Sequence, residues 1–239
     1  VQVEAAAALG ARVLLTRGSM SLGEADGGLP PDAVVQREDL ILADCERVVA
    51  AHHDASADAF VRIALAPCSP FSVSDGLMRE SAALARAQGV RLHTHLGETR
   101  DEDAWCLATH GVRPLDYLAA CDWLAGDVWL AHGIHFDDRE LARLGEAGVA
   151  VCHCPSSNML LGSGVCRVPE LEAAGAPVGL GVDGSASNDC SNLITEARQA
   201  MLLQKLARGS AAVSARDALR WATAGGAATL GWDGIGRLE

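Results

Sequence analysis

The chain has 239 residues, of which 49% are hydrophobic, and its formal net charge at pH 7 is -12. This length is enough for one large domain or two small ones, and the apolar content allows a large core. The acidic balance argues against a nucleic-acid partner or an anionic membrane surface, because both need clustered lysine and arginine. No apolar run reaches the ~18 residues of a membrane-spanning helix, and no signal peptide is recognisable.

The eight cysteines show no regular spacing, and several lie inside apolar runs. In a chain of this length such a pattern indicates buried, reduced thiols rather than a disulfide framework. We therefore expect a cytoplasmic protein.

Along the chain, apolar runs that predict strands alternate with segments of helical periodicity. The predicted strands are 11–16, 61–66, a strand within 90–98, 128–132, 149–154 and 178–182. The predicted helices are 3–9, 31–52, 74–88, 102–110, 114–120, 137–147, 169–174, 193–206 and 214–223. A Gly- and Pro-rich loop is predicted at 23–31.

The alternation predicts an α/β fold. Strand and helix alternate six times, and each unit has roughly the thirty residues that a (β/α)₈ barrel of ~250 residues requires. The strands are continuous apolar runs, as expected when both faces are buried. A doubly wound open sheet is the alternative, but it usually carries a Gly-rich phosphate loop after its first strand, and none is present. We predict a TIM-type barrel truncated to about six β/α units.

Reactive side chains follow the predicted strands at their C-terminal ends. They are Arg17, Cys68, His95 with Glu98, His132, Asn158 and Asp183. In a barrel these ends meet at one face, where active sites lie. Burying an ionised aspartate is costly without a partner, and a metal ion is a good partner. We predict ligand or catalytic roles for His95 and Asp183, and an active-site role for His132.

Several other residues keep two interpretations. His135 is either a loop residue or a substrate contact. Arg17, Cys68 and Asn158 are candidates for reading the edges of a substrate ring, and a structural role is at least as well supported for each. Cys152-His153-Cys154 has the composition of a zinc cluster, but strand alternation places the two cysteines on one face and His153 on the other. We therefore expect His153 at the rim of the active site.

Four motifs resemble those of the amidohydrolase superfamily. They are H-L-G-E at 95–98, A-H-G-I-H at 131–135, C-P-S-S-N at 154–158 and G-V-D-G-S-A-S-N-D at 181–189. Their order and spacing match its cytosolic deaminase and s-triazine hydrolase branch. Within that branch, segments 17–31 and 65–73 most resemble the 8-oxoguanine deaminases. The resemblance covers almost the whole chain.

The resemblance implies one divalent metal ion, usually zinc and sometimes iron, with His95 and Asp183 among its ligands. Family members take two further ligands from a His-x-His pair at the end of the first barrel strand. The pair in this chain, His93-Thr94-His95, lies in a later strand. We therefore expect residues 1–239 to be a partial barrel domain that lacks the first two strands and the small β-domain of the family.

The resemblance also implies a mechanism. Asp183 would take a proton from the attacking water, His132 would polarise the oxygen, and Glu98 would protonate the ring nitrogen and then the leaving amine. The expected reaction is deamination of a purine-like amino heterocycle, with conversion of 8-oxoguanine to urate and ammonia as the best candidate. The alternatives are an s-triazine amidohydrolase of the hydroxyatrazine type, a deaminase of guanine or another purine, and an inactive truncated module. Whether the protein forms a homo-oligomer stays open.

Overall fold

The computed structural model describes residues 1–238. These divide into two compact units, one made of 1–94 with 118–123, and the other of 95–117 with 124 onward. The chain contributes six strands to a sheet whose strand order follows the chain, β1-β2-β3-β4-β5-β6. All strand pairs with a described register are parallel, as expected for an α/β fold built from β/α units.

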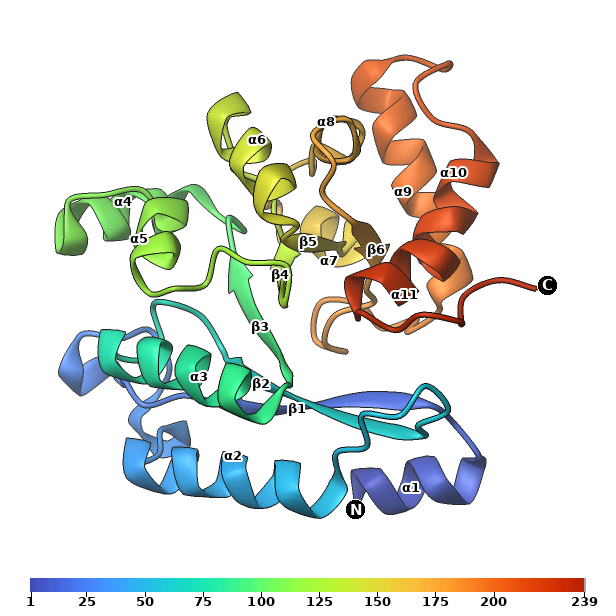
Figure 1. Ribbon diagram of the computed structural model, residues 1–239. Helices are drawn as coiled ribbons and strands as arrows, with labels where there is room; N and C mark the ends of the chain where they lie inside the picture. The colour runs from blue at the N-terminus through green and yellow to red at the C-terminus, as the bar shows by residue number, and fades with distance from the viewer. Residues whose placement is uncertain (239) are drawn as a thin grey trace. The chain divides into compact units, whose positions relative to one another are not determined.

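The first unit holds β1 (Val13–Ser19), β2 (Val61–Pro67) and the start of β3 (Arg91–Leu96), with α1 (Gln2–Leu9), α2 (Glu38–His52) and α3 (Asp75–Gln88). In Figure 1, α2 and α3 lie along β1 and β2. Helix α2 contacts both strands, and α3 contacts β2. The ends of α3 follow from local chemistry. Ser74 Oγ accepts the N–H of Leu77 at 3.1 Å, and Gly89 leaves the helix at φ +67°, a backbone conformation that favours glycine.

Two boundaries in this unit differ from the prediction. The helix expected from Pro31 begins only at Glu38, after short 3₁₀ turns at η1 (Glu24–Asp26) and η2 (Asp32–Val34). Val35 there is extended, and Asp32 instead accepts the N–H of Ala25 at 3.1 Å. Strand β1 runs on to Ser19 because β2 pairs with it as far as Pro67. Arg17 therefore lies inside β1 rather than after its end.

The second unit holds the end of β3 and the strands β4 (Val128–His132), β5 (Ala150–His153) and β6 (Val178–Leu180). Its helical elements are α4 (Arg100–His110), most of α5 (Pro114–Ala120), α6 (Asp138–Ala147), α7 (Pro155–Leu160), α8 (Val168–Ala173), α9 (Leu193–Arg208), α10 (Ala215–Arg220), the π-helical turn η3 (Trp221–Gly225) and α11 (Gly226–Thr229). Every residue of β4 is buried. The helices α9 and α11 contact β6, beside which they lie in Figure 1.

The second unit contains two helices that were not predicted, α7 and α11. The segment P-S-S-N, expected only as the end of the fifth strand, forms α7, with Pro155 in its first turn. Proline is favourable there because the first helical N–H groups lack intrahelical partners. Asn158 is thus a helical residue. Strand β6 ends at Leu180, so Asp183 lies three residues beyond it rather than one.

All eight cysteines are free thiols. Within residues 1–238, no helix combines the length and the apolar character needed to cross a membrane.

Candidate metal centre

Three of the predicted site residues come together in the second unit. His95 lies in β3, His132 is the last residue of β4, and Asp183 follows β6. Each offers one ligand atom, and these atoms all lie within 4.8 Å of one another. One pair of these atoms, His132 Nε2 and Asp183 Oδ2, is 3.9 Å apart. Zinc takes imidazole nitrogen and carboxylate oxygen at about 2.0–2.2 Å. Two ligand atoms of one zinc ion are therefore at most about 4.4 Å apart. The 3.9 Å pair lies within that limit, and the 4.8 Å bound on the other separations is close to it.

The backbone at two of these residues is unusual. His132 has φ +71° and Asp183 has φ +64°, a region that non-glycine residues rarely adopt. Such conformations cost on the order of 1–3 kcal/mol and persist where the surroundings enforce them, as in active sites. The fold therefore accepts a strained backbone at His132 and at Asp183, and this backbone directs the two side chains.

A residue of α7, Asn158, fixes the orientation of the His132 ring. Its Nδ1 lies 2.9 Å from Oδ1 of Asn158. An amide oxygen only accepts hydrogen bonds, so Nδ1 donates this bond and Nε2 is the ring nitrogen that faces the site. That Nε2 faces two carboxylates, with Glu98 Oε2 at 3.5 Å and Asp183 Oδ2 at 3.9 Å. His132 is only 1% exposed, so these neighbours define its surroundings.

Asp183 is held by hydrogen bonds on both oxygens. Ser157 Oγ donates to Oδ2 at 2.5 Å, and the N–H of Gly184 donates to Oδ1 at 2.7 Å. Burial acts to raise the pKa of this carboxyl group, but the Ser157 and Gly184 hydrogen bonds and the nearby imidazoles outweigh it and hold the pKa below its usual value. Asp183 is therefore ionised at neutral pH, as a metal ligand must be.

The cysteine–histidine segment on β5 does not join this cluster. The sulfur atoms of Cys152 and Cys154 both face Gly181, as strand alternation predicts. His153 is fully buried rather than at the rim, and burial lowers its pKa to about 3. Its Nδ1 lies 3.5 Å from Nδ2 of Asn158, and its Nε2 has no hydrogen-bond partner among the described residues.

The substrate-contact candidates make contacts within the protein. His135 Nε2 lies 2.9 Å from the carbonyl oxygen of Ser163, a contact that joins the loop after β4 to the segment that follows α7. Arg17 forms an ion pair with Asp44 at 2.7 Å and donates to Gln36 at 3.1 Å. Cys68 follows β2, and its carbonyl accepts from Thr94 Oγ1 at 3.3 Å. Asn158 orients His132. Contacts of these four residues with substrate stay a prediction.

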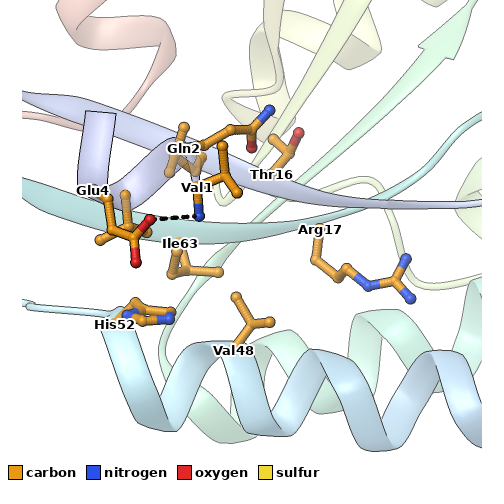
Figure 2. Close-up of a pocket in the computed structure, with 10 residues that line it drawn as sticks. Val1, Gln2, Glu4, Thr16, Arg17, Val48, His52 and Ile63 are labelled. Carbon is orange, nitrogen blue, oxygen red and sulfur yellow. Dashed lines mark ion pairs between the residues drawn. The ribbon is translucent and has the colours of Figure 1, made fainter. Parts of the chain in front are cut away.

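The first unit contains a cavity of about 290 Å³ (Figure 2). Its lining includes Arg17, His52 and Glu4, and the dashed line in Figure 2 is the 3.4 Å ion pair between Glu4 and the amino group of Val1. Among residues 1–238, the group of His95, His132 and Asp183 is the one cluster with metal-ligand geometry. The cavity therefore provides no metal site of its own.

The sequence profile of the amidohydrolase family matches residues 2–239. The chain belongs to the amidohydrolase family. The 8-oxoguanine deaminase of Pseudomonas aeruginosa is 58% identical over 238 residues, which are 100% of this chain and 53% of that protein. The resemblance found in the motifs is thereby confirmed.

Two solved structures of this family have the same fold. The zinc-complexed atrazine chlorohydrolase of Arthrobacter aurescens TC1 matches with a TM-score of 0.95 and 35% identity, over 99% of this chain and 53% of that one. A zinc-bound adenosine deaminase from Xanthomonas campestris matches with a TM-score of 0.90 and 30% identity, over 100% and 52%. The predicted fold class, a TIM-type barrel of which this chain forms about six β/α units, is confirmed. The chain spans about half the length of the relatives it matches.

Two residues of the site were missed in the sequence. Ser157 donates to Asp183, and no local pattern marks that contact because the two residues lie on separate elements. Glu102 accepts hydrogen bonds from the turn that carries Glu98. Its signal was present, because Thr99 and Glu102 have the spacing of a helix capping box.

Proposed function

We propose that this chain supplies the metal-binding part of the active site of a hydrolytic deaminase. The substrate class is a purine-like amino heterocycle, with 8-oxoguanine as the best candidate and urate and ammonia as products. The observation that carries the proposal is the convergence of His95, His132 and Asp183 within 4.8 Å, with Glu98 3.5 Å from His132. The 58% identity to an 8-oxoguanine deaminase supports the choice of substrate.

The cofactor in this proposal is one divalent metal ion, zinc rather than iron, with His95 and Asp183 among its ligands. The donor set of imidazole nitrogen and carboxylate oxygen suits zinc, and two similar structures contain zinc. Bound there, such an ion lowers the pKa of a water molecule from ~15.7 towards ~7, which makes a nucleophile available at neutral pH.

The protein side chains then orient the water and move its protons. Asp183, whose pKa is held low, accepts the first proton from the attacking water. His132, with the hydrogen of its Asn158 contact on Nδ1, presents Nε2 to the space beside Glu98 and Asp183, where it orients the water. Asn158 keeps His132 in that tautomer, because its oxygen must accept the hydrogen on Nδ1.

Glu98 serves as the general acid. It protonates the ring nitrogen as the water oxygen bonds to the amino-bearing carbon, and later it protonates the amino group. The carbon–nitrogen bond breaks, ammonia leaves and an oxo group remains. The two protons of the water, first held by Asp183 and by the new hydroxyl group, replace those that Glu98 donated. General acid–base catalysis of this kind contributes ~10²–10⁴-fold.

One alternative substrate class has support of its own. The atrazine chlorohydrolase structure matches with a TM-score of 0.95, so an s-triazine is the second candidate.

We also propose that residues 1–239 are part of a larger barrel domain. We propose further that the protein acts in the cytoplasm. The free thiols support this localisation, because reducing compartments keep cysteines unpaired.

The test uses the full-length protein purified with its metal. Zinc is measured by elemental analysis, and ammonia release is followed with 8-oxoguanine, guanine, another aminopurine and hydroxyatrazine. The proposal predicts bound zinc and the highest kcat/KM for 8-oxoguanine. The highest kcat/KM for hydroxyatrazine would favour the triazine alternative. No ammonia from any compound in zinc-loaded protein would reject the deaminase reaction.

A further inference from the structure

A buried carboxylate in α4 collects three backbone N–H groups from the turn after β3. Glu102 Oε2 accepts from Gly97 at 2.7 Å, and Oε1 accepts from Glu98 at 2.9 Å and from Thr99 at 3.2 Å. Glu102 is 8% exposed, so few water molecules compete for these bonds. The three consecutive peptide groups therefore wrap around one side chain.

The same turn is tied to the loop that follows His132. The carbonyl oxygen of Gly97 accepts the N–H groups of Ile134 at 2.8 Å and His135 at 2.9 Å. Gly97 has φ +67°, and a Cβ added to it would lie 3.1 Å from the ring of Phe136. A larger side chain would be strained at this position, which explains the glycine. The hydrogen bonds on both sides of the turn, to Glu102 and from the loop after His132, then restrict its conformation.

Helix capping alone does not account for this arrangement. Two other helices have the same kind of box. In α6, Glu140 accepts the N–H of Asp137 at 2.9 Å, and in α10, Asp217 accepts that of Ser214 at 2.9 Å. In both boxes the carboxylate accepts one backbone N–H, that of the N-cap residue, and its other described hydrogen bonds come from side chains. Glu102 receives this bond and two more from residues before the cap, one of which is Glu98.

From this geometry we infer that Glu102 is a positioning residue, which holds the backbone of Glu98 so that its carboxylate reaches the space beside His132. The inference rests on the proposed catalytic role of Glu98. Glu98 Oε2 lies 3.5 Å from His132 Nε2, and a displacement of about 1 Å at such a site can cost 10²-fold in rate. Glu102 itself acts only through the turn.

The bonding also requires the ionised form of Glu102. A carboxylate accepts at both oxygens, whereas a protonated carboxyl group has one donor oxygen. Burial raises the pKa of Glu102 to about 7, while the N–H groups of Glu98, Gly97 and Thr99 act in the opposite direction. Replacing the carboxylate by an amide sets an NH₂ group against at least one of the three N–H donors.

The experiment uses the full-length, metal-loaded protein with three variants. Glu102→Gln removes one acceptor. Thr99→Val removes the hydroxyl group of the same capping box and keeps the carboxylate, and Asp217→Asn makes the corresponding acidic-to-amide change in α10. For each variant, kcat and KM are measured by ammonia release, zinc by elemental analysis, and amide hydrogen exchange in the peptide that covers 97–99.

We expect Glu102→Gln to lower kcat about 10²-fold, with similar KM and zinc content and faster exchange at 97–99. Thr99→Val and Asp217→Asn should keep a kcat close to that of the wild type. If Glu102→Gln does not fold, Glu102→Asp, which keeps the charge on a shorter side chain, is measured in its place.

Any folded Glu102 variant with fast exchange at 97–99 and unchanged kcat would overturn the inference. An equal loss of kcat in Thr99→Val would overturn it too, because general fraying of α4 would then be sufficient. If the wild type releases no ammonia but exchange still responds to Glu102→Gln, the proposed function fails while the role of Glu102 in holding the turn stands.

Discussion

The ends of β4 and β5 each carry a buried histidine, and only one of them belongs to the candidate site. His132 and His153 are each the last residue of their strand and are 1% and 0% exposed. Both approach Asn158, His132 through Nδ1 at 2.9 Å and His153 through Nδ1 at 3.5 Å. Position along the strand and burial therefore do not distinguish them.

The partners of Nε2 distinguish the two histidines. For His132, Nε2 lies 3.5 Å from Glu98 and 3.9 Å from Asp183. For His153, Nε2 has no partner among the described residues, and burial lowers the pKa to about 3. A buried histidine near carboxylates can bind metal or move protons, whereas one in an apolar environment stays neutral. The nearby carboxylates therefore make His132, and not His153, suited to metal binding or proton transfer.

The largest expected effect comes from changing the carboxylate beside His132. Glu98→Gln keeps the shape of the side chain but cannot carry a proton. In the full-length protein we expect kcat to fall ~10²–10⁴-fold while zinc content is retained, because Glu98 is a proton carrier rather than a ligand in this account. Steady-state ammonia release and elemental analysis measure both. Glu146→Gln, an exposed change on α6, is the control, and a Glu98→Gln rate equal to the control would remove Glu98 from the mechanism.

A smaller effect is expected from changing the residue that both histidines share. Asn158→Leu removes the acceptor for His132 Nδ1 and frees the ring to change tautomer or rotate. Residues that orient the groups around a metal typically contribute 10–100-fold to activity or metal affinity, so we expect a loss of that size. Asn158→Asp, which restores an acceptor, should recover part of the rate. An Asn158→Leu protein with normal kcat and zinc would show that His132 does not need this partner.

Much of this site could be predicted from the sequence. Apolar runs that end in His95, His132 and Asp183 marked three strand exits, and parallel strands bring such exits to one edge of a sheet. The ends of α3 followed from Ser74 and Gly89, the usual residues for starting and stopping a helix.

The contacts between side chains could not be predicted in the same way. Asn158 was predicted only to follow the fifth strand, and the helix that proline can start there was not recognised. Its bond to His132 joins residues 26 positions apart, and no local pattern reports that proximity. His153 and His132 look alike in the sequence because burial and partners are properties of the fold.

The smallest expected effect on activity concerns His153, whose influence is on stability. The unfolded chain takes up a proton near pH 6.5, but the buried ring does so only near pH 3. The contribution of His153 to stability is therefore present above about pH 6.5 and is lost as the pH falls towards 3. Between pH 7 and pH 5 this lowers the free energy of unfolding by about 2 kcal/mol.

Urea unfolding of wild type and His153→Phe at both pH values measures this effect. We expect the pH dependence of the variant to be smaller by about that amount. The exposed His52→Phe is the control, which should keep the wild-type dependence. If His153→Phe has the same dependence as the wild type, another group determines the acid sensitivity.

The most direct test of the account is the position of the metal ion in the full-length protein. A crystal grown with zinc, with anomalous data collected on both sides of the zinc absorption edge, locates the ion independently of the protein atoms. The account predicts one strong peak at about 2.0–2.2 Å from a nitrogen of His95 and an oxygen of Asp183, next to Nε2 of His132. A fully occupied zinc ion elsewhere, with His95 and Asp183 free of metal, would contradict it.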